Sequence, residues 1–84
     1  MRPSKNEPLM RALAIEIKAR RLALEMSQED LAGKCDLDRP YISLIEVARK
    51  QPTISVLLKL SEGLDYGLPE MMERVMSRYL VESK

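Results

Sequence analysis

Residues 27–52 limit what this chain can fold into more than any other stretch, because they read as two short helices joined by a tight turn. Ser27 is placed to cap the first helix, and Asp30 stands where a capping box has its acid. The run 36–38, Asp-Leu-Asp, ends this helix, because Asp tolerates left-handed backbone. Pro40 then belongs in the first turn of the next helix, where its missing N–H costs little.

The second of these helices is expected to run to about Ala48 and to have two unlike faces. At 100° per residue, Tyr41, Ile42 and Ile45 share one face. The opposite, outward face mixes polar and apolar side chains, namely Pro40, Ser43, Leu44 and Val47, with Arg39 at its edge. This arrangement predicts a helix that packs on one side and can contact a partner on the other.

The rest of the chain also reads as helix. Residues 1–8 contain two prolines and no periodicity, so we expect an extended N-terminal arm. Apolar side chains recur every three to four residues over 9–26, Thr53 is placed to cap a further helix, and Pro69 opens a last helix over 68–82. No stretch alternates as a strand does. We therefore expect an all-α, compact five-helix bundle that forms a single domain over residues 9–84.

The last two helices supply core residues and an interface. The fourth helix is expected to bury Ile54, Leu57, Leu58 and Leu64. The apolar stripe of the fifth helix is wider than one small domain needs, so we assign part of it to the core and part to a homodimer interface. The interface candidates are Met72, Val75, Met76, Tyr79 and Leu80. Core packing alone is the alternative.

Two small residues of the helix that Ser27 caps bear on its packing. Gly33 lies on the outer face and costs about 1 kcal/mol relative to Ala. It either permits close approach to a backbone or is simply tolerated. Cys35 lies on the inner face with Leu31 and Ala32, and is expected to be a buried apolar side chain, with redox sensing as the minor alternative.

Composition argues against several classes of function. The 84 residues include no His, the commonest general base and metal ligand, and only one Cys, which cannot form an intrachain disulfide or a zinc cluster. No Gly-rich phosphate loop is present. We expect no enzyme, no metal or other cofactor, and no small-molecule ligand. The absence of a long apolar run or signal-peptide pattern predicts a cytoplasmic protein without membrane contact.

The charge distribution is uneven although the net charge is only +1. A nearly neutral chain counts mildly against nucleic-acid binding. The first 26 residues, however, carry six basic residues against three acids: Arg2, Lys5, Arg11, Lys18, Arg20 and Arg21 against Glu7, Glu16 and Glu25. A local basic rim is compatible with this distribution.

The run MSQEDLAGKCDLDRPYISLIEVARKQPTISVLLKLSEGL closely resembles the Cro-type, lambda-repressor-like helix-turn-helix family. This family includes phage repressors and the small controller proteins of restriction-modification systems. The resemblance spans residues 13–64, and its motifs Ser-Gln-Glu-x-Leu-Ala, Tyr-Ile-Ser-x-Ile-Glu and Pro-Thr-x-x-x-Leu occur together at the family's spacings. It implies a protein that lays its second motif helix in the major groove of double-stranded DNA.

The resemblance also implies roles for single residues. Gln28 matches a Gln that usually contacts DNA at or near a phosphate, and Arg21 and Glu46 match a buried structural ion pair. Groove-facing positions are held by Arg39, Pro40, Ser43 and Leu44, and positions that often touch phosphates by Tyr41, Arg49, Lys50 and Gln51. Three residues depart from the family pattern: Asp36 and Ala48 stand where Gly is usual, and Pro40 replaces a small polar residue, which removes two hydrogen-bond donors.

Each candidate contact has a plain alternative. Arg39 can bind guanine O6 and N7 with two hydrogen bonds, worth about 1–3 kcal/mol of discrimination, or it is solvated or paired with Asp36 or Asp38. Gln28 at a helix start can bring its amide and the helix N-terminus to one phosphate, or is simple terminal polarity. Leu44 and Val47 can meet thymine methyls or a partner, or are ordinary surface residues.

Two functions follow from this reading. The first is a sequence-specific transcriptional regulator, of the repressor kind, that binds a short palindromic operator as a homodimer and regulates through its own concentration. The second is a helix-turn-helix protein-interaction module, such as an antitoxin or an adaptor, with weak or no sequence-specific DNA binding. The near-zero net charge and the apolar pair Leu44 and Val47 favour the second.

Overall fold

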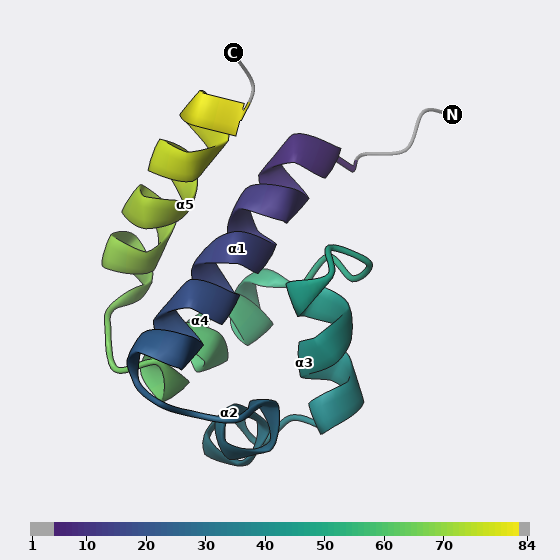
Figure 1. Cartoon of the computed structure of the whole chain (residues 1–84), viewed down its shortest axis with the longest axis vertical. Helices are drawn as coiled ribbons and strands as arrows, with labels where there is room; N and C mark the ends of the chain where they lie inside the picture. Colours follow the sequence, from purple (N-terminus) through teal and green to yellow (C-terminus); the bar gives the residue numbers. More distant parts are fainter. Residues whose placement is uncertain (1–4, 83–84) are drawn as a thin grey trace.

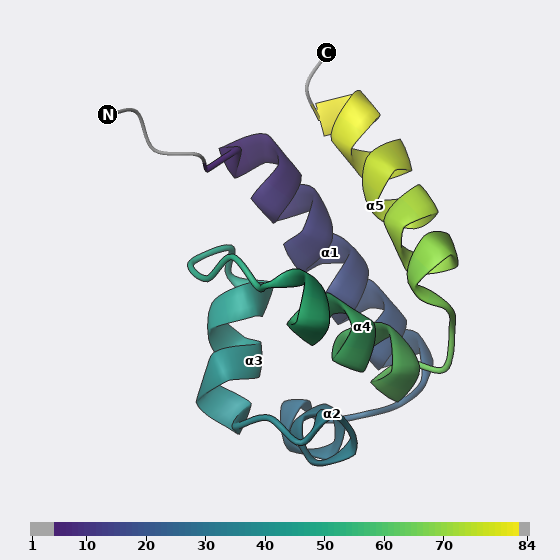
Figure 2. The same cartoon turned by 180° about the vertical axis from the view of Figure 1, so that it is seen from behind.

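The computed structural model describes residues 5–82, which form five helices and no strand. The helices are α1 (Glu7–Ala23), α2 (Gln28–Cys35), α3 (Arg39–Glu46), α4 (Ile54–Gly63) and α5 (Leu68–Glu82). In Figures 1 and 2, α1 runs through the middle of the molecule between α3 and α5, and the start of α1 and the end of α5 lie at the same end of the bundle. The expected all-α, five-helix architecture is confirmed.

The ends of α1 differ from those expected. The side chain of Asn6 accepts a hydrogen bond of 3.1 Å from the amide of Leu9, so the helix begins at Glu7 and includes the last two residues of the expected arm. Pro8 fits there because the first turn needs no N–H from it. Of the rest of the arm, Lys5 is exposed, and residues 1–4, with Arg2, lie outside the described residues.

The opposite end of α1 comes earlier than residue 26. Helix α1 ends at Ala23 with Leu24 as its C-cap, because Glu25 takes a left-handed conformation with φ 58°. The chain then enters the capping box of α2 as expected, in which Ser27 Oγ accepts from the Asp30 amide and the Asp30 carboxylate accepts from the Ser27 amide, each at 2.9 Å. The hydrogen bond from the Ser27 backbone lowers the pKa of Asp30.

A residue with left-handed backbone also follows α2, and another follows α3. Asp36 has φ 54° and forms the turn into α3, so Asp stands in for the usual Gly. Ala48, where the family commonly has Gly, has φ 59°. Because Ala48 takes this conformation two residues after Glu46, α3 ends at Glu46 and not at residue 48.

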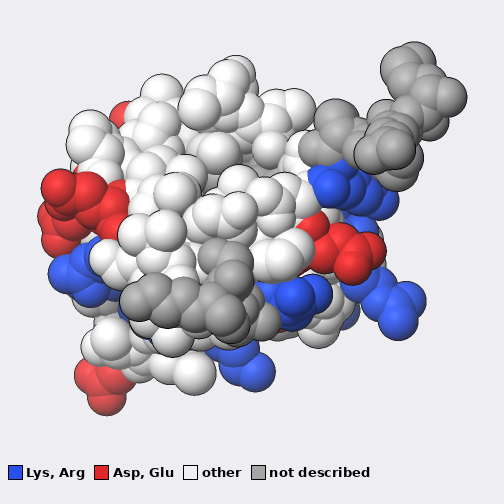
Figure 3. Space-filling view, turned by 90° about the horizontal axis from the view of Figure 1, so that it is seen from above, with Lys and Arg blue, Asp and Glu red and all other residues white. Residues whose placement is uncertain are grey.

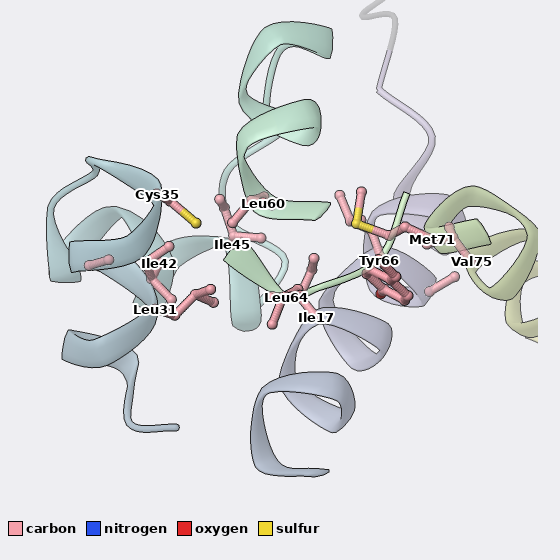
Figure 4. Packing of buried hydrophobic residues seen from close by; sticks show 13 residues of the cluster. Ile17, Leu31, Cys35, Ile42, Ile45, Leu60, Leu64, Tyr66, Met71 and Val75 are labelled. Atoms are coloured by element: carbon pink, nitrogen blue, oxygen red, sulfur yellow. The ribbon is translucent and has the colours of Figure 1, made fainter. Parts of the chain in front are cut away.

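The core lies between the five helices, with α1 packed against α3 and α5, and α2 and α4 packed against each other. Figure 4 shows its largest members converging from all five helices and the turn before α5. These buried side chains include Ile17, Leu31, Ile42, Ile45, Leu60, Leu64, Tyr66, Met71 and Val75. Core contacts of this kind provide most of the stability of a small helical domain.

Part of the expected core is exposed. Ile54 and Leu58 are 69% and 46% exposed, so the expectation that they are buried is wrong. The buried residues of α4 are Leu60, Ser61 and Gly63. Leu64, directly after the helix, is buried as expected, and Leu57 is half-buried. Leu58 lies on the far side of α4 from its buried residues, and Ile54 lies in the exposed first turn.

Val75 requires the opposite correction. It has no exposed surface and packs in the core, so it cannot contribute to a homodimer interface as expected. Of the other α5 candidates, Met76 and Leu80 are exposed, and Met72 and Tyr79 are half-buried.

A buried polar cluster, which the sequence did not indicate, fastens α5 to α1. The Glu16 side chain in α1 is 2% exposed and accepts hydrogen bonds from Tyr66 Oη at 2.8 Å and from Arg78 Nε at 2.9 Å. Burial, and then the bond to Glu16, raise the pKa of the Tyr66 phenol well above its usual range. Arg20 covers the Tyr66 ring at 4.5 Å and donates to the carbonyl of Leu64 at 2.9 Å.

Two helical glycines occupy unlike surroundings. A Cβ at Gly33 would meet nothing within 4 Å, so this glycine is tolerated and is not required by packing within the chain. A Cβ at Gly63 would overlap the sulfur of Cys35. Cys35 itself is 3% exposed, and burial raises the pKa of its thiol.

Replacing each glycine by alanine should therefore change stability in opposite directions. Gly33→Ala should raise the free energy of unfolding by about 1 kcal/mol, since Ala is the better helix former. Gly63→Ala should lower it by about 1–3 kcal/mol, because the added methyl overpacks the contact between α2 and α4. Urea unfolding followed by circular dichroism measures both. Shifts of the same sign would contradict this description of the packing.

Candidate nucleic-acid interface

Helix α3 lies at the edge of the bundle with one long side open (Figures 1 and 2). Ile42 and Ile45 are completely buried and attach the helix to the core. The open side presents most of the residues expected to face a groove: Arg39, Pro40 and Leu44 are exposed, and Ser43 is half-buried. Val47 follows on the same side and is 59% exposed.

A buried ion pair attaches α3 to α1. Arg21 Nε donates to Glu46 Oε2 at 2.7 Å and Nη2 donates to Oε1 at 2.9 Å, while Nη1 donates to the carbonyl of Met26 at 2.7 Å. The two side chains are 8% and 2% exposed. The hydrogen bond to Glu46 raises the pKa of Arg21 above its ordinary value, although burial opposes the shift. The structure thus places both residues as the resemblance implies.

Gln28, the first residue of α2, connects this pair to the open side of α3. Its Nε2 donates to Glu46 Oε1 at 3.1 Å, and its Oε1 accepts from Arg39 Nη1 at 3.3 Å. The hydrogen-bond partner of Arg39 is therefore Gln28 and not one of the two neighbouring aspartates. This contact could not be predicted from the sequence, because it depends on how the starts of α2 and α3 meet in space.

The loop from α3 to α4 forms a basic rim beside the open side of α3. Arg49, Lys50 and Gln51 are exposed. The Lys50 ammonium lies 5.8 Å from the centroid of the half-buried Tyr41 ring, within range of a cation–π contact. Arg49 also lines a depression of about 300 Å³ with two basic residues from the start of the chain, Lys5 and Arg11.

The charge on this surface differs from that of the whole chain. The residues expected to contact DNA are Gln28, Arg39, Pro40, Tyr41, Ser43, Leu44, Arg49, Lys50 and Gln51, of which three are basic and none is acidic. Figure 3 shows the end of the molecule where α1 begins and α5 ends, with basic side chains gathered on its α3 side and acidic ones among them. The surface combines a helix open to a groove with cations at its margin.

Other kinds of site find less support. Within residues 5–82, no group of His, Cys, Asp or Glu is arranged to hold a metal ion. No helix in the same part of the chain is long and apolar enough to cross a bilayer.

Removing Glu46 should damage the fold far more than removing an exposed glutamate. Glu46→Ala leaves the buried Arg21 guanidinium without its carboxylate and should lower the free energy of unfolding by about 3–5 kcal/mol. Glu70→Ala removes an exposed ion pair to Arg74, of 3.0 Å, and should change it by about 0.5 kcal/mol or less. Urea unfolding of both variants tests this, and equal losses would show that the buried pair does not hold α3.

Comparisons with known proteins agree on one family. Residues 17–71 match the family model described as helix-turn-helix. Control protein C.MunI from Mycoplasma sp is 36% identical over 58 residues, which cover 69% of this chain and 78% of that protein. Control protein C.SmaI from Serratia marcescens is 32% identical over 62 residues, 74% of each protein.

A solved structure matches over a larger part of the chain. The restriction-modification controller protein C.Esp1396I, crystallised as a tetramer in complex with its natural 35 base-pair operator, superposes with a TM-score of 0.80. It is 38% identical, and the match covers 86% of this chain and 95% of that one.

Proposed function

The chain belongs to the helix-turn-helix family, and we propose that it is a DNA-binding transcriptional regulator that recognises a short palindromic operator as a homodimer. The observation that carries this function is the open side of α3, which is polar at its start, bordered by cations, and fastened to the core by a buried ion pair. That C.Esp1396I is found on its operator supports the same function for a chain of the same fold.

Base recognition would begin at Arg39. A guanidinium can donate two parallel hydrogen bonds to guanine O6 and N7 in the major groove. Arg39 is exposed at the start of α3, the end of a recognition helix that usually contacts base edges. Ser43 and Leu44, one turn further along, are placed for a base edge and for a thymine methyl.

Phosphate contacts would flank this helix on both sides. The α2 N-terminus can meet one strand through its first backbone amides. The rim formed by Tyr41, Arg49, Lys50 and Gln51 can meet the other. Contacts of this kind fix register on the duplex and release counterions, so the affinity should depend on salt.

The protein should select a sequence from a random pool of DNA duplexes, and its affinity for the selected duplex should fall steeply with salt. Arg39→Ala should lower discrimination at one base pair of each half-site by about tenfold, which corresponds to the loss of a bidentate contact. Arg74→Ala, on α5, is the matched control and should retain discrimination. Fluorescence anisotropy on the selected duplex measures the salt dependence and the discrimination of both variants.

Failure to select any sequence would contradict the proposed function and favour the protein-interaction module. If Arg39→Ala binds as selectively as the unchanged protein, the regulator survives but the assignment of its base contact does not. The selection itself should yield two inverted half-sites one helical turn apart, about 34 Å.

The dimer would form through α5 with a contribution from α4. Met76 and Leu80 on α5 are 39% and 57% exposed, and the exposed Ile54 and Leu58 are on α4. Between these helices, half-buried Met72 and Leu57 line an apolar depression of about 200 Å³. Figure 3 shows a broad area of this end of the molecule without charged side chains. An extended apolar surface of this kind is typical of an interface.

A charge placed on α5 should therefore separate the dimer without unfolding the protomer. Leu80→Glu puts a carboxylate into the proposed interface and should raise the dimer dissociation constant by at least about tenfold. Leu22→Glu on α1 is the matched control, because Leu22 is 56% exposed and Leu80 57%. Sedimentation velocity gives the dissociation constants. A monomeric unchanged protein, or equal effects of both substitutions, would contradict this interface.

A further inference from the structure

Four side chains form a continuous series of hydrogen bonds from the inside of the protein to its DNA-facing surface. Arg21 donates twice to Glu46, Gln28 donates to Glu46 at 3.1 Å, and Arg39 donates to Gln28 at 3.3 Å. The first two side chains are almost wholly buried, Gln28 is half-buried and Arg39 is exposed. The series therefore links a buried ion pair to the side chain best placed to contact a base.

Only one orientation of the Gln28 amide fits both neighbours. Its NH₂ group faces a carboxylate, which can only accept, and its carbonyl faces a guanidinium, which can only donate. A flipped amide would set oxygen against oxygen and NH₂ against guanidinium. Because Arg21 already holds Glu46, the carboxylate determines which way the amide of Gln28 points.

We propose that Gln28 is a positioning residue for Arg39, and that the buried pair of Arg21 and Glu46 acts through it on base discrimination. The contact engages Nη1 and leaves the edge formed by Nε and Nη2 available for two hydrogen bonds to guanine. The proposal rests on the proposed function, since it concerns how the same surface reads DNA.

The physical gain is preorganisation. An exposed Arg loses considerable rotamer freedom when it binds a base. If Gln28 restricts Arg39 before binding, less freedom is lost in the complex. The gain is realised only where Arg39 makes its base contact, so it raises affinity for the cognate base pair and not for a substituted one.

The role assigned to Gln28 by the family resemblance makes a different prediction. A phosphate contact fixes register but carries no sequence information. Its loss should weaken binding to cognate and substituted duplexes by the same factor. Loss of a positioning contact should weaken cognate binding more.

Gln28→Met tests this, because Met keeps the length of the side chain and removes both amide groups. The probe is the duplex that the unchanged protein selects from a random pool, together with the same duplex substituted at the base pair where Arg39→Ala loses discrimination. Gln28→Met should lower the ratio of the two affinities by roughly two- to tenfold. In an Arg39→Ala background it should leave the ratio unchanged. Equal weakening on both duplexes, or the same change in ratio in both backgrounds, would overturn the proposal.

A matched control and a measurement without DNA complete the test. Ala19→Met, at an exposed position of α1 outside the proposed DNA contacts, should not change the ratio, and circular dichroism checks that each variant is folded. In the free protein, the ¹⁵N order parameter of Arg39 Nε should fall in Gln28→Met, and an unchanged value would also overturn the proposal. If the unchanged protein selects no duplex, the proposed function fails, whereas the order parameter still reports on the positioning contact.

Discussion

The buried ion pair between Arg21 and Glu46 is the interaction on which the DNA-facing side of this protein depends. Burying two charges is unfavourable unless their hydrogen-bonding groups are satisfied. Here the Arg21 guanidinium donates to both carboxylate oxygens of Glu46 and to the carbonyl of Met26, and Gln28 donates a further hydrogen bond to the same carboxylate. Since these groups belong to α1, α2, α3 and the turn between α1 and α2, the pair determines how the two motif helices sit on the rest of the bundle.

A second buried carboxylate, that of Glu16, determines how α5 sits on α1. Glu16 binds Tyr66 and Arg78, so the turn before α5 and α5 itself are attached to α1 by directional bonds as well as by apolar packing. Helix α1 thus connects the helix proposed to read DNA with the helix proposed to form the dimer. In a two-fold dimer, the distance between recognition helices depends on how α3 and α5 are placed within one protomer. Bonds at two positions of α1 make that placement rigid.

Local chemistry made much of this structure predictable. The Ser27 capping box, the left-handed Asp36 and the Thr53 cap each depend on neighbours in the chain, and each was expected from the sequence. The errors concern contacts between distant segments. Periodicity shows that a helix has an apolar face but not which element covers it, so Leu58 was expected inside and Val75 at an interface. The two unlike faces of α3 were predictable, because they follow from local periodicity. The links from Glu16 to Tyr66 and from Gln28 to Arg39 were not predictable, because they join distant segments of the chain.

The small net charge makes the geometry of the proposed reading surface more important. A strongly basic protein gains affinity for any duplex through phosphate contacts and counterion release. With a net charge of +1 and three basic residues among its nine DNA-contact candidates, this chain has little of that general affinity to add. Its ratio of specific to non-specific binding must come from a few directed contacts. An Arg that is held in position before it contacts a base is well suited to that requirement. It loses less conformational entropy on binding, so more of the contact's free energy contributes to discrimination.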